Sequence, residues 1–275
     1  MPNCDSSVNP EKQLLTISIV TYRPDFTELR NTLDSLAIAL EKISGNRFSI
    51  VIIDNSNQDL VSPFLTKNYA TLPWYVIHGQ GNIGFGRAHN LALEAMGRFH
   101  LILNPDIELH PDAIINAITF MSTNPHCGLI TPYAQWPDGE RQYLCKQYPA
   151  VFDLMLRGFA AKKIRSLFQR RLDRYEMKIQ TQDEVYWGPL IVSGCFMFFD
   201  SSILQRTNGF CDDYFLYFED FDLSLRVHTF ADIAYVPTVR IIHAGGHAAK
   251  KGLWHIRNFI KSASLFYLRH GLKIF

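Results

Sequence analysis

The sequence predicts an α/β fold in which a doubly wound, mainly parallel central sheet is covered by helices on both faces. Up to about residue 125, β-branched runs alternate with amphipathic segments, the pattern of parallel strands joined by right-handed helical crossovers. The run 48–53 is almost continuously apolar, as expected of a strand buried on both faces. Of the 275 residues, 47% are hydrophobic and 19% charged, a balance that supports a folded core.

The first half of the chain contains four expected strands separated by helical segments. The strands are expected at residues 16–22, 48–53, 74–78 and 100–103, where β-branched and aromatic residues cluster between polar turns. After the first strand, Leu29, Leu33 and Leu36 recur at helical spacing, which predicts an amphipathic helix that faces the sheet. Further helices are expected at 87–96 and 112–121, the second directly after Pro111.

The second half is less regular, and we expect strands at 128–133, 190–199 and 233–239. Residues 150–178 form a basic, amphipathic helical stretch, and helices are also expected at 219–230 and 253–270. No linker divides the chain. We therefore expect a single domain over residues 1–275, with two halves at 14–125 and 126–248 and a C-terminal basic amphipathic helix at 249–275.

Charge and cysteine content argue against several classes of protein. Lys+Arg 27 against Asp+Glu 26 gives a formal net charge of +1, which argues against nucleic acid as a partner. The five cysteines are scattered without a CxxC pair, so we expect a reducing compartment and neither a disulfide framework nor a zinc knuckle. The first 13 residues are polar, and no run of ~18 apolar residues occurs. These features predict a cytoplasmic protein, which could rest on a membrane surface.

Polar or glycine-rich sequence follows each of the four strands of the first half. The segments are Thr21-Tyr22-Arg23, Asp54-Asn55, 81–86 and Asn104-Pro105-Asp106. Because the carboxyl ends of parallel strands meet at one edge of a sheet, we expect these segments to form a ligand site there. Each segment alone is also typical of an ordinary turn, since Asp and Asn are common turn formers.

Asp106, His243 and Asp54 are candidates for specific contacts. The Asp106 carboxylate can offer a hard oxygen ligand to Mg²⁺ or Mn²⁺, and His243, which follows a late strand, could complete that site. A single histidine after a strand is more often a structural residue than a ligand. Asp54 ends a buried strand and could accept the imide N–H of a uracil or thymine ring; the alternative is that it caps a turn.

Three carboxylates begin the helix expected at 219–230. Glu219, Asp220 and Asp222 are favoured there by the helix dipole alone. The aromatic segment 214–218 precedes them, and a carboxylate beside such an apolar wall can gain basicity and act as a general base. Asp222 and Arg226 lie four residues apart, which predicts a supporting ion pair.

The spacing of Gly79, Gly81 and Gly84 offers a competing interpretation. It fits the dinucleotide-binding fingerprint, with Asp106 near the distance of a ribose-binding acid. The match follows the third expected strand, however, and the first strand ends in residues 21–24 without a glycine. A nicotinamide-dependent enzyme would also leave Asp54 and the acidic helix start unexplained.

Two basic segments allow two interpretations. Residues 157–178 hold eight Lys/Arg and two acids, and residues 249–275 hold six Lys/Arg and no acid. Each can be a solvated helix face. The terminal segment, which includes Trp254, can also be an interfacial helix that lies on anionic lipid.

Taken in order along the chain, these motifs resemble those of family 2 glycosyltransferases. They are Ser18 to Tyr22, Ile53 to Asn55, Gly81 to Asn90, Leu103 to Asp106, Gly194 to Phe199, Phe218 to Arg226 and His243. The resemblance covers residues 14–270, and within the family the chain looks most like rhamnosyltransferase-type members that build bacterial surface polysaccharides. It implies a GT-A fold, a nucleotide-sugar donor, a divalent cation (Mg²⁺ or Mn²⁺) and inversion at the anomeric carbon.

The resemblance assigns the half at 14–125 to nucleotide binding. Thr21, Tyr22 and Arg23 would line the nucleotide pocket, and Asp54 would read the base. The residues that would border the ribose and the diphosphate are Asn82, Gly86 and Asn90.

The half at 126–248 would bind the acceptor and contribute the catalytic groups. At the end of the fourth strand of the first half, Asn104-Pro105-Asp106 stands where the family has Asp-x-Asp, with Asn104 in place of the first acid and expected to bind the nucleotide sugar. That departure leaves Asp106 as the surer metal ligand, and His243 matches the family's histidine after the late strand, the second expected ligand. Asp220 would be the general base, and Glu219 would contact or position the acceptor.

Two functions from different classes remain at this point. The first is an inverting glycosyltransferase that uses a dTDP- or UDP-linked sugar, with dTDP-L-rhamnose favoured, on a lipid-linked or saccharide acceptor at the inner face of the cell membrane. The second is a non-catalytic, sugar-nucleotide-binding scaffold subunit of a polysaccharide assembly complex, which only Asn104 suggests.

Overall fold

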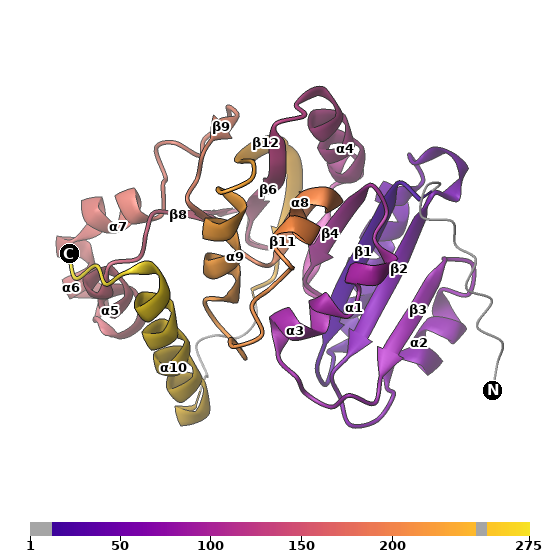
Figure 1. The fold of residues 1–275 in the computed structure, drawn as a ribbon, viewed down its shortest axis with the longest axis horizontal. Helices are drawn as coiled ribbons and strands as arrows, with labels where there is room; N and C mark the ends of the chain where they lie inside the picture. The colour runs from indigo at the N-terminus through magenta and orange to yellow at the C-terminus, as the bar shows by residue number, and fades with distance from the viewer. Residues whose placement is uncertain (1–12, 246–251) are drawn as a thin grey trace.

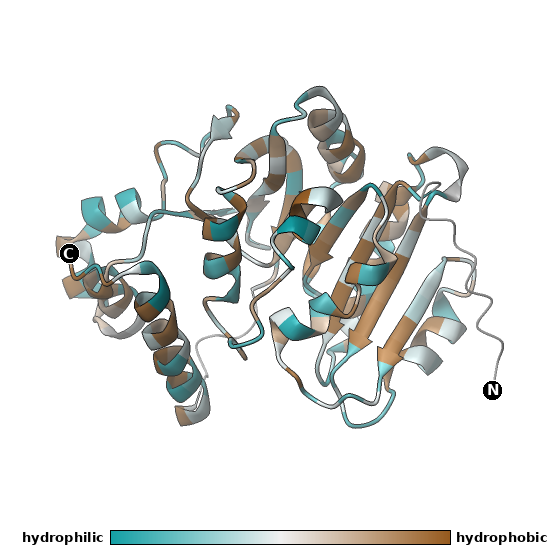
Figure 2. Ribbon diagram, viewed as in Figure 1, coloured by the Kyte–Doolittle hydropathy of each residue, from teal (hydrophilic) through white to brown (hydrophobic). Residues whose placement is uncertain are grey.

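A computed structural model describes residues 13–245 and 252–275 of the chain. Its first half contains four parallel strands, β1 (Leu15–Thr21), β2 (Phe48–Asp54), β3 (Trp74–His78) and β4 (Phe99–Leu103), in the spatial order β3-β2-β1-β4 (Figure 1). These strands are mostly apolar, as their colour in Figure 2 shows, because helices cover both faces. The four parallel strands predicted from the sequence are confirmed.

Helices α1 (Phe26–Leu40), α2 (Val61–Asn68) and α3 (Phe85–Asn90) connect these strands. Helix α1 begins after Asp25, whose Oδ1 accepts the N–H groups of Thr27 at 2.8 Å and Glu28 at 3.3 Å. Its buried face contains the leucine stripe predicted from the sequence. The helix expected at 87–96 is shorter than predicted, because α3 gives way to a 3₁₀ turn at Leu93–Ala95.

The second half of the sheet is mixed. Strand β11 (Phe196–Asp200) pairs antiparallel with β4, and β6 (Cys127–Gln135), β12 (Asp232–His243) and β5 (Ile107–Leu109) follow outward. Short strands β7 (Arg141–Gln142) and β9 (Tyr186–Trp187) extend this half. The single strand expected at 190–199 was wrong. Instead β10 (Ile191–Val192) pairs with β8 (Cys145–Lys146), and a turn over 193–195 separates it from β11.

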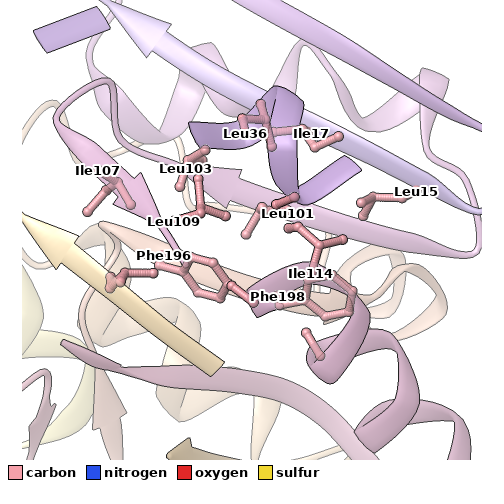
Figure 3. Packing of buried hydrophobic residues seen from close by; sticks show 14 of the residues in the cluster. Leu15, Ile17, Leu36, Leu101, Leu103, Ile107, Leu109, Ile114, Phe196 and Phe198 are labelled. Atoms are coloured by element: carbon pink, nitrogen blue, oxygen red, sulfur yellow. The ribbon is translucent and has the colours of Figure 1, made fainter. Parts of the chain in front are cut away.

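One face of the sheet carries the larger part of the core. Leu36 of α1 and Ile114 of α4 (Ala113–Thr123) pack among side chains of β1, β4, β5 and β11, including Ile17, Leu101 and Phe198 (Figure 3). All five are fully or almost fully buried, and each such side chain contributes roughly 1.5–3 kcal/mol to folding. On the opposite face lie α3, α8 (Ser201–Arg206) and α9 (Glu219–Val227). This packing holds the strand ends that carry the site in fixed positions.

Helices α5 (Val151–Phe159), α6 (Lys162–Leu167), α7 (Gln169–Tyr175) and α10 (Leu253–His270) gather at the end of the molecule opposite α2 and β3, and we call them the helical end (Figure 1). The continuous helical stretch expected at 150–178 was wrong: the backbone is extended at Ala160 and Ala161, and the chain bends again at Phe168. The terminal helix expected at 253–270 is confirmed. Within the described ranges, no helix is both long and apolar enough to cross a bilayer.

Candidate active site

The ends of β1 and β2 bring Thr21 and Asp54 together. They are register partners, and the Thr21 hydroxyl donates to Asp54 Oδ1 at 3.3 Å. The Asp54 carboxylate also accepts the N–H groups of Ser56 at 2.9 Å and Leu60 at 3.1 Å. Asp54 is therefore a turn cap, the alternative that its sequence left open. Its side chain is fully buried, so contact with a base requires neighbouring groups to move, and that role stays a prediction.

Tyr22 and Arg23 project from the same sheet edge. Arg23 has a left-handed backbone, with φ of 50°, and its N–H donates to Ser56 Oγ at 2.9 Å. The Arg23 guanidinium lies 5.3 Å from the centre of the Tyr22 ring. Both side chains are exposed, so they are free to contact a ligand at this edge.

The glycine-rich loop at 79–86 lies against the segment that precedes α9. At Gly84, φ is 96° and an added Cβ would lie 2.3 Å from the Phe215 carbonyl oxygen, so only glycine fits there. The next residue, Phe85, donates its N–H to that same carbonyl at 3.2 Å. Asn82 Oδ1 accepts the Gly84 N–H at 3.2 Å, which places Asn82 in the loop's own turn.

Gly86 and Asn90 hold α3 against residues 210–212. A Cβ at Gly86 would lie 2.7 Å from the Phe210 Cβ. The Asn90 amide donates to the Phe210 carbonyl at 2.8 Å and accepts the Phe210 N–H at 2.9 Å. These contacts give both residues a structural explanation, and their proposed position beside the ribose and diphosphate stays a prediction.

Asp106 and His243 meet where β4 and β12 end. Asp106 Oδ2 lies 3.5 Å from His243 Nε2, and the other ring nitrogen of His243 lies 2.7 Å from Gln142 Oε1. Two buried oxygens at this point, Asn104 Oδ1 and Asp106 Oδ1, have no hydrogen-bond partner. Unpartnered buried oxygens are costly, and carboxylate and amide oxygens are ligands that a hard divalent cation accepts.

Burial lowers the pKa of His243, but the neighbouring Cys195 and Asp106 outweigh it and raise the pKa to about 10. The imidazole is therefore protonated at neutral pH and gives the Asp106 carboxylate a positive partner. Binding of a metal ion by His243 would have to release this proton, because the ligand form of the ring is neutral.

Glu219 and Asp220 are the first two residues of α9. Burial raises the pKa of Asp220 to about 6, although its carboxylate accepts the N–H groups of Gly194 at 2.9 Å and Phe221 at 3.0 Å. Burial and the Asp220 charge raise the pKa of Glu219 to about 8, and Glu219 Oε2 has no hydrogen-bond partner. At neutral pH Asp220 is ionised and Glu219 is protonated.

Asp220 and His243 line one cavity of about 470 Å³. Trp136 forms part of the wall, and its ring is stacked on that of His243 with the centroids 6.3 Å apart. The proposed base and one of the two expected metal ligands thus line a common space, and Asp106 lies directly behind His243; their catalytic and metal-binding roles stay predictions.

Several residues of this site were not identified from the sequence. Gly194 positions Asp220, and a Cβ there would lie 3.2 Å from both Asp220 Cβ and Phe85 Cε1. Tyr217 and Phe218, with φ of 72° and 66°, form a left-handed turn that directs α9. The cavity is also lined by residues from a part of the chain whose apolar residues show no clear helical or strand periodicity. They are Trp136, Arg141, Gln142, Lys146 and Lys178.

A family model for glycosyl transferase family 2 matches residues 16–206, well over half of the chain. The chain belongs to glycosyltransferase family 2. This membership makes the chain a glycosyltransferase and decides against the nicotinamide-dependent enzyme that the glycine spacing left open.

Two curated relatives extend the match over most of the chain. An N-acetylglucosaminyl-diphospho-decaprenol L-rhamnosyltransferase of Mycobacterium tuberculosis is 24% identical over 271 residues, covering 92% of this chain and 83% of the relative. Rhamnosyltransferase WbbL of Escherichia coli K12 is 25% identical over 242 residues, covering 82% and 86%.

Solved structures agree in fold. The mannosyltransferase PcManGT of Pyrobaculum calidifontis, in complex with GDP-Man and Mn²⁺, has a TM-score of 0.63 at 17% identity and covers 96% of this chain and 67% of its own. GalNAc-T7 with UDP, GalNAc and Mn²⁺ has a TM-score of 0.61 at 14% identity over 84% of this chain. This chain spans 43% of the GalNAc-T7 chain. The fold is of the GT-A type, as the resemblance implied.

Proposed function

We propose that this glycosyltransferase transfers L-rhamnose, with inversion, from a dTDP- or UDP-linked donor to a lipid-linked or saccharide acceptor in bacterial polysaccharide synthesis. The two curated rhamnosyltransferase relatives support the sugar, and the name of the mycobacterial relative supports a diphosphate-linked lipid acceptor. One observation carries the reaction type: Asp220 and His243 line the same cavity, and Asp106 Oδ2 lies 3.5 Å from His243 Nε2.

The residues fit a divalent cation held by few protein ligands. Asp106 and His243 would hold Mg²⁺ or Mn²⁺, with the buried Asn104 side-chain oxygen within the same segment as a neutral donor. No group of three or more His, Cys, Asp or Glu side chains in the described ranges could hold a metal ion, so phosphate and water oxygens would fill the other positions. When bound, the cation would neutralise the negative charge that develops on the departing nucleoside diphosphate.

Asp220 is suited to remove a proton at neutral pH. As the acceptor oxygen bonds to the anomeric carbon, its proton passes to Asp220, and the bond between that carbon and the phosphate oxygen breaks with its electron pair on the diphosphate. The N–H donors of Gly194 and Phe221 keep the carboxylate oriented during this step. Glu219 is protonated beside it and can donate a hydrogen bond that positions the acceptor.

Substitution of Asp220 tests this assignment. Asp220→Asn should reduce transfer by about 10²–10⁴-fold, since a general base contributes a factor of this size, while the affinity for dTDP or UDP stays unchanged. The measurement is release of nucleoside diphosphate in the presence of acceptor. The matched variant Asp138→Asn, at an exposed turn, should keep full turnover. Normal turnover by Asp220→Asn would remove Asp220 from this role.

We also propose that the helical end contacts anionic membrane lipid. Leu253, Ile260 and Leu268 are spaced seven and eight residues apart, so they share one face of α10, and their exposed fractions are 85%, 57% and 85%. Exposed basic side chains of α6 and α7 accompany this stripe, among them Lys162, Lys163 and Arg170. An apolar stripe beside cations is typical of a helix that lies in the headgroup region.

A further inference from the structure

The cavity that contains Asp220 adjoins a larger one within the helical end. The larger cavity has a volume of about 950 Å³ and is lined by residues of α5, α6, α7 and α10. Arg157 and Glu176 line both cavities. A ligand could therefore occupy the two spaces at once, with one end beside Asp220.

Cations crowd the junction between the two cavities. Glu176 is contacted by Lys146 at 3.9 Å, Arg157 at 3.2 Å and Lys178 at 3.5 Å. Lys178 also contacts a second carboxylate, that of Asp173, at 2.7 Å. Lys146 and Arg157 therefore depend on the single carboxylate of Glu176 as their shared ion-pair partner. Lys146 is almost fully buried. We call Lys146, Arg157 and Lys178 the cation cluster; its excess of positive charge over carboxylate favours an anion with several oxygens.

The wall of the larger cavity has an apolar part. Leu154, Leu172, Ile256 and Phe259 form that part, and polar and basic side chains, among them Lys162, Arg165 and Gln169, line the remainder. A volume of 950 Å³ lies at the upper end of the range for small-molecule pockets, which suits a ligand with a long hydrocarbon part.

We propose that the cation cluster binds the diphosphate of a lipid-linked acceptor, with the start of its hydrocarbon chain in the larger cavity and its sugar beside Asp220. The phosphate oxygens take the place that Glu176 holds in the free protein. This inference rests on the proposed function, because it assigns the acceptor of that reaction to a position in the structure.

Binding of farnesyl diphosphate by calorimetry tests the site. Arg157→Gln and Lys178→Gln should each raise its Kd roughly tenfold, a change of about 1.4 kcal/mol. Lys67→Gln, at an exposed cation of α2 that lines neither cavity, should leave the Kd unchanged. Ile256→Asn should weaken farnesyl diphosphate but not inorganic pyrophosphate, whereas Ile38→Asn, on the exposed face of α1, should affect neither.

The anion could come from the donor instead, and the same variants separate the two sources. Affinity for dTDP and UDP should be unchanged in all of them; an equal loss would assign the cation cluster to the donor diphosphate and overturn the proposal. Unchanged farnesyl diphosphate binding in Arg157→Gln and Lys178→Gln would also overturn it. Because these are binding measurements, the site can stand even if Asp220→Asn keeps its turnover, and it can fail while the proposed reaction stands.

Discussion

At the level of single residues, Glu219 and Asp220 show how local hydrogen bonds give two adjacent carboxylates different pKa values. Burial raises the pKa of both, but Asp220 receives two N–H donors that favour its ionised form. The outcome is a pKa of about 6 for Asp220 and about 8 for Glu219. The aromatic segment before α9 predicted raised basicity from the sequence. The Gly194 N–H could not be predicted, since it depends on how a turn 26 residues earlier in the chain approaches α9.

Glu219→Gln should stabilise the protein at alkaline pH. The folded pKa of about 8 lies above the ordinary value of 4.5, so the unfolded chain loses its Glu219 proton first as pH rises. The ionisation of Glu219 therefore costs the folded state no stability below pH 4.5, and this cost grows as pH rises from 4.5 to 8. The variant should gain stability by about 1.4 kcal/mol for each pH unit between 4.5 and 8, several kcal/mol in free energy of unfolding at pH 8, and almost nothing at pH 4. Urea denaturation at both pH values measures this difference, with the exposed Glu108→Gln as control. A gain of equal size at pH 4 would contradict the ionisation argument.

At the level of elements, α9 begins with two non-glycine residues in left-handed backbone, Tyr217 and Phe218. Each such residue costs roughly 1–3 kcal/mol, which the surroundings must offset. Phe218 does so by packing its ring 5.3 Å from Phe259 and 5.2 Å from Phe266, both on α10. Regular elements such as α1 and β1 follow from sequence periodicity. The turn at Tyr217 and Phe218 cannot be predicted in this way, because α10, the helix that stabilises it, lies about 40 residues further along the chain.

The apolar stripe of α10 leads to a prediction about membrane binding. Leu268→Ser should reduce co-sedimentation with vesicles of phosphatidylcholine and phosphatidylglycerol several-fold, because it removes apolar area from the proposed interfacial face. Raising the salt concentration should weaken binding further by screening the basic side chains. Leu91→Ser, also exposed but in the half at 14–125, is the matched control. Equal binding of the two variants would exclude the stripe as the contact.

At the level of the whole molecule, the parallel half of the sheet was predictable and the other half was not. Strands β1 to β4 alternate with helices along the chain, so periodicity predicts these strands and their parallel arrangement, but not their spatial order β3-β2-β1-β4. Strands β11, β6, β12 and β5 are joined by long connections and pair out of sequence. Asp106, Asp220 and His243 could be named from motifs. The cations of the cavity, such as Lys146, come from the irregular region and required the structure.

The parallel half also contains a buried polar group that should make the protein sensitive to acid. Ser18 Oγ lies 2.8 Å from His89 Nδ1 and 2.9 Å from His100 Nε2, and both rings are almost completely buried. Burial lowers the pKa of His100 to about 3, and burial together with His100 lowers the pKa of His89 well below its usual value. The folded protein keeps both rings neutral where the unfolded chain would protonate them.

Stability should therefore be complete above pH 6.5 and fall as pH decreases, by about 1.4 kcal/mol per pH unit for each histidine. His100→Gln keeps a group that can hydrogen-bond Ser18 but cannot ionise, so it should remove about half of this slope. Urea denaturation between pH 4.5 and 7 gives the slopes, and the exposed His126→Gln should match the unmodified protein. An unchanged slope in His100→Gln would show that other groups cause acid unfolding.

Asp222 connects α9, the helix that carries the proposed base, to the C-terminal helix α10. This buried carboxylate of α9 contacts Arg226 at 2.7 Å and also His270 of α10 at 2.8 Å. Asp220, two residues earlier on the same helix, faces the cavity. The contact between Asp222 and His270 therefore ties α10 to the helix that carries the proposed base. A displacement of α10 would shift the end of α9 from which Asp220 enters the cavity, so the proposed lipid contact would act on turnover as well as on attachment.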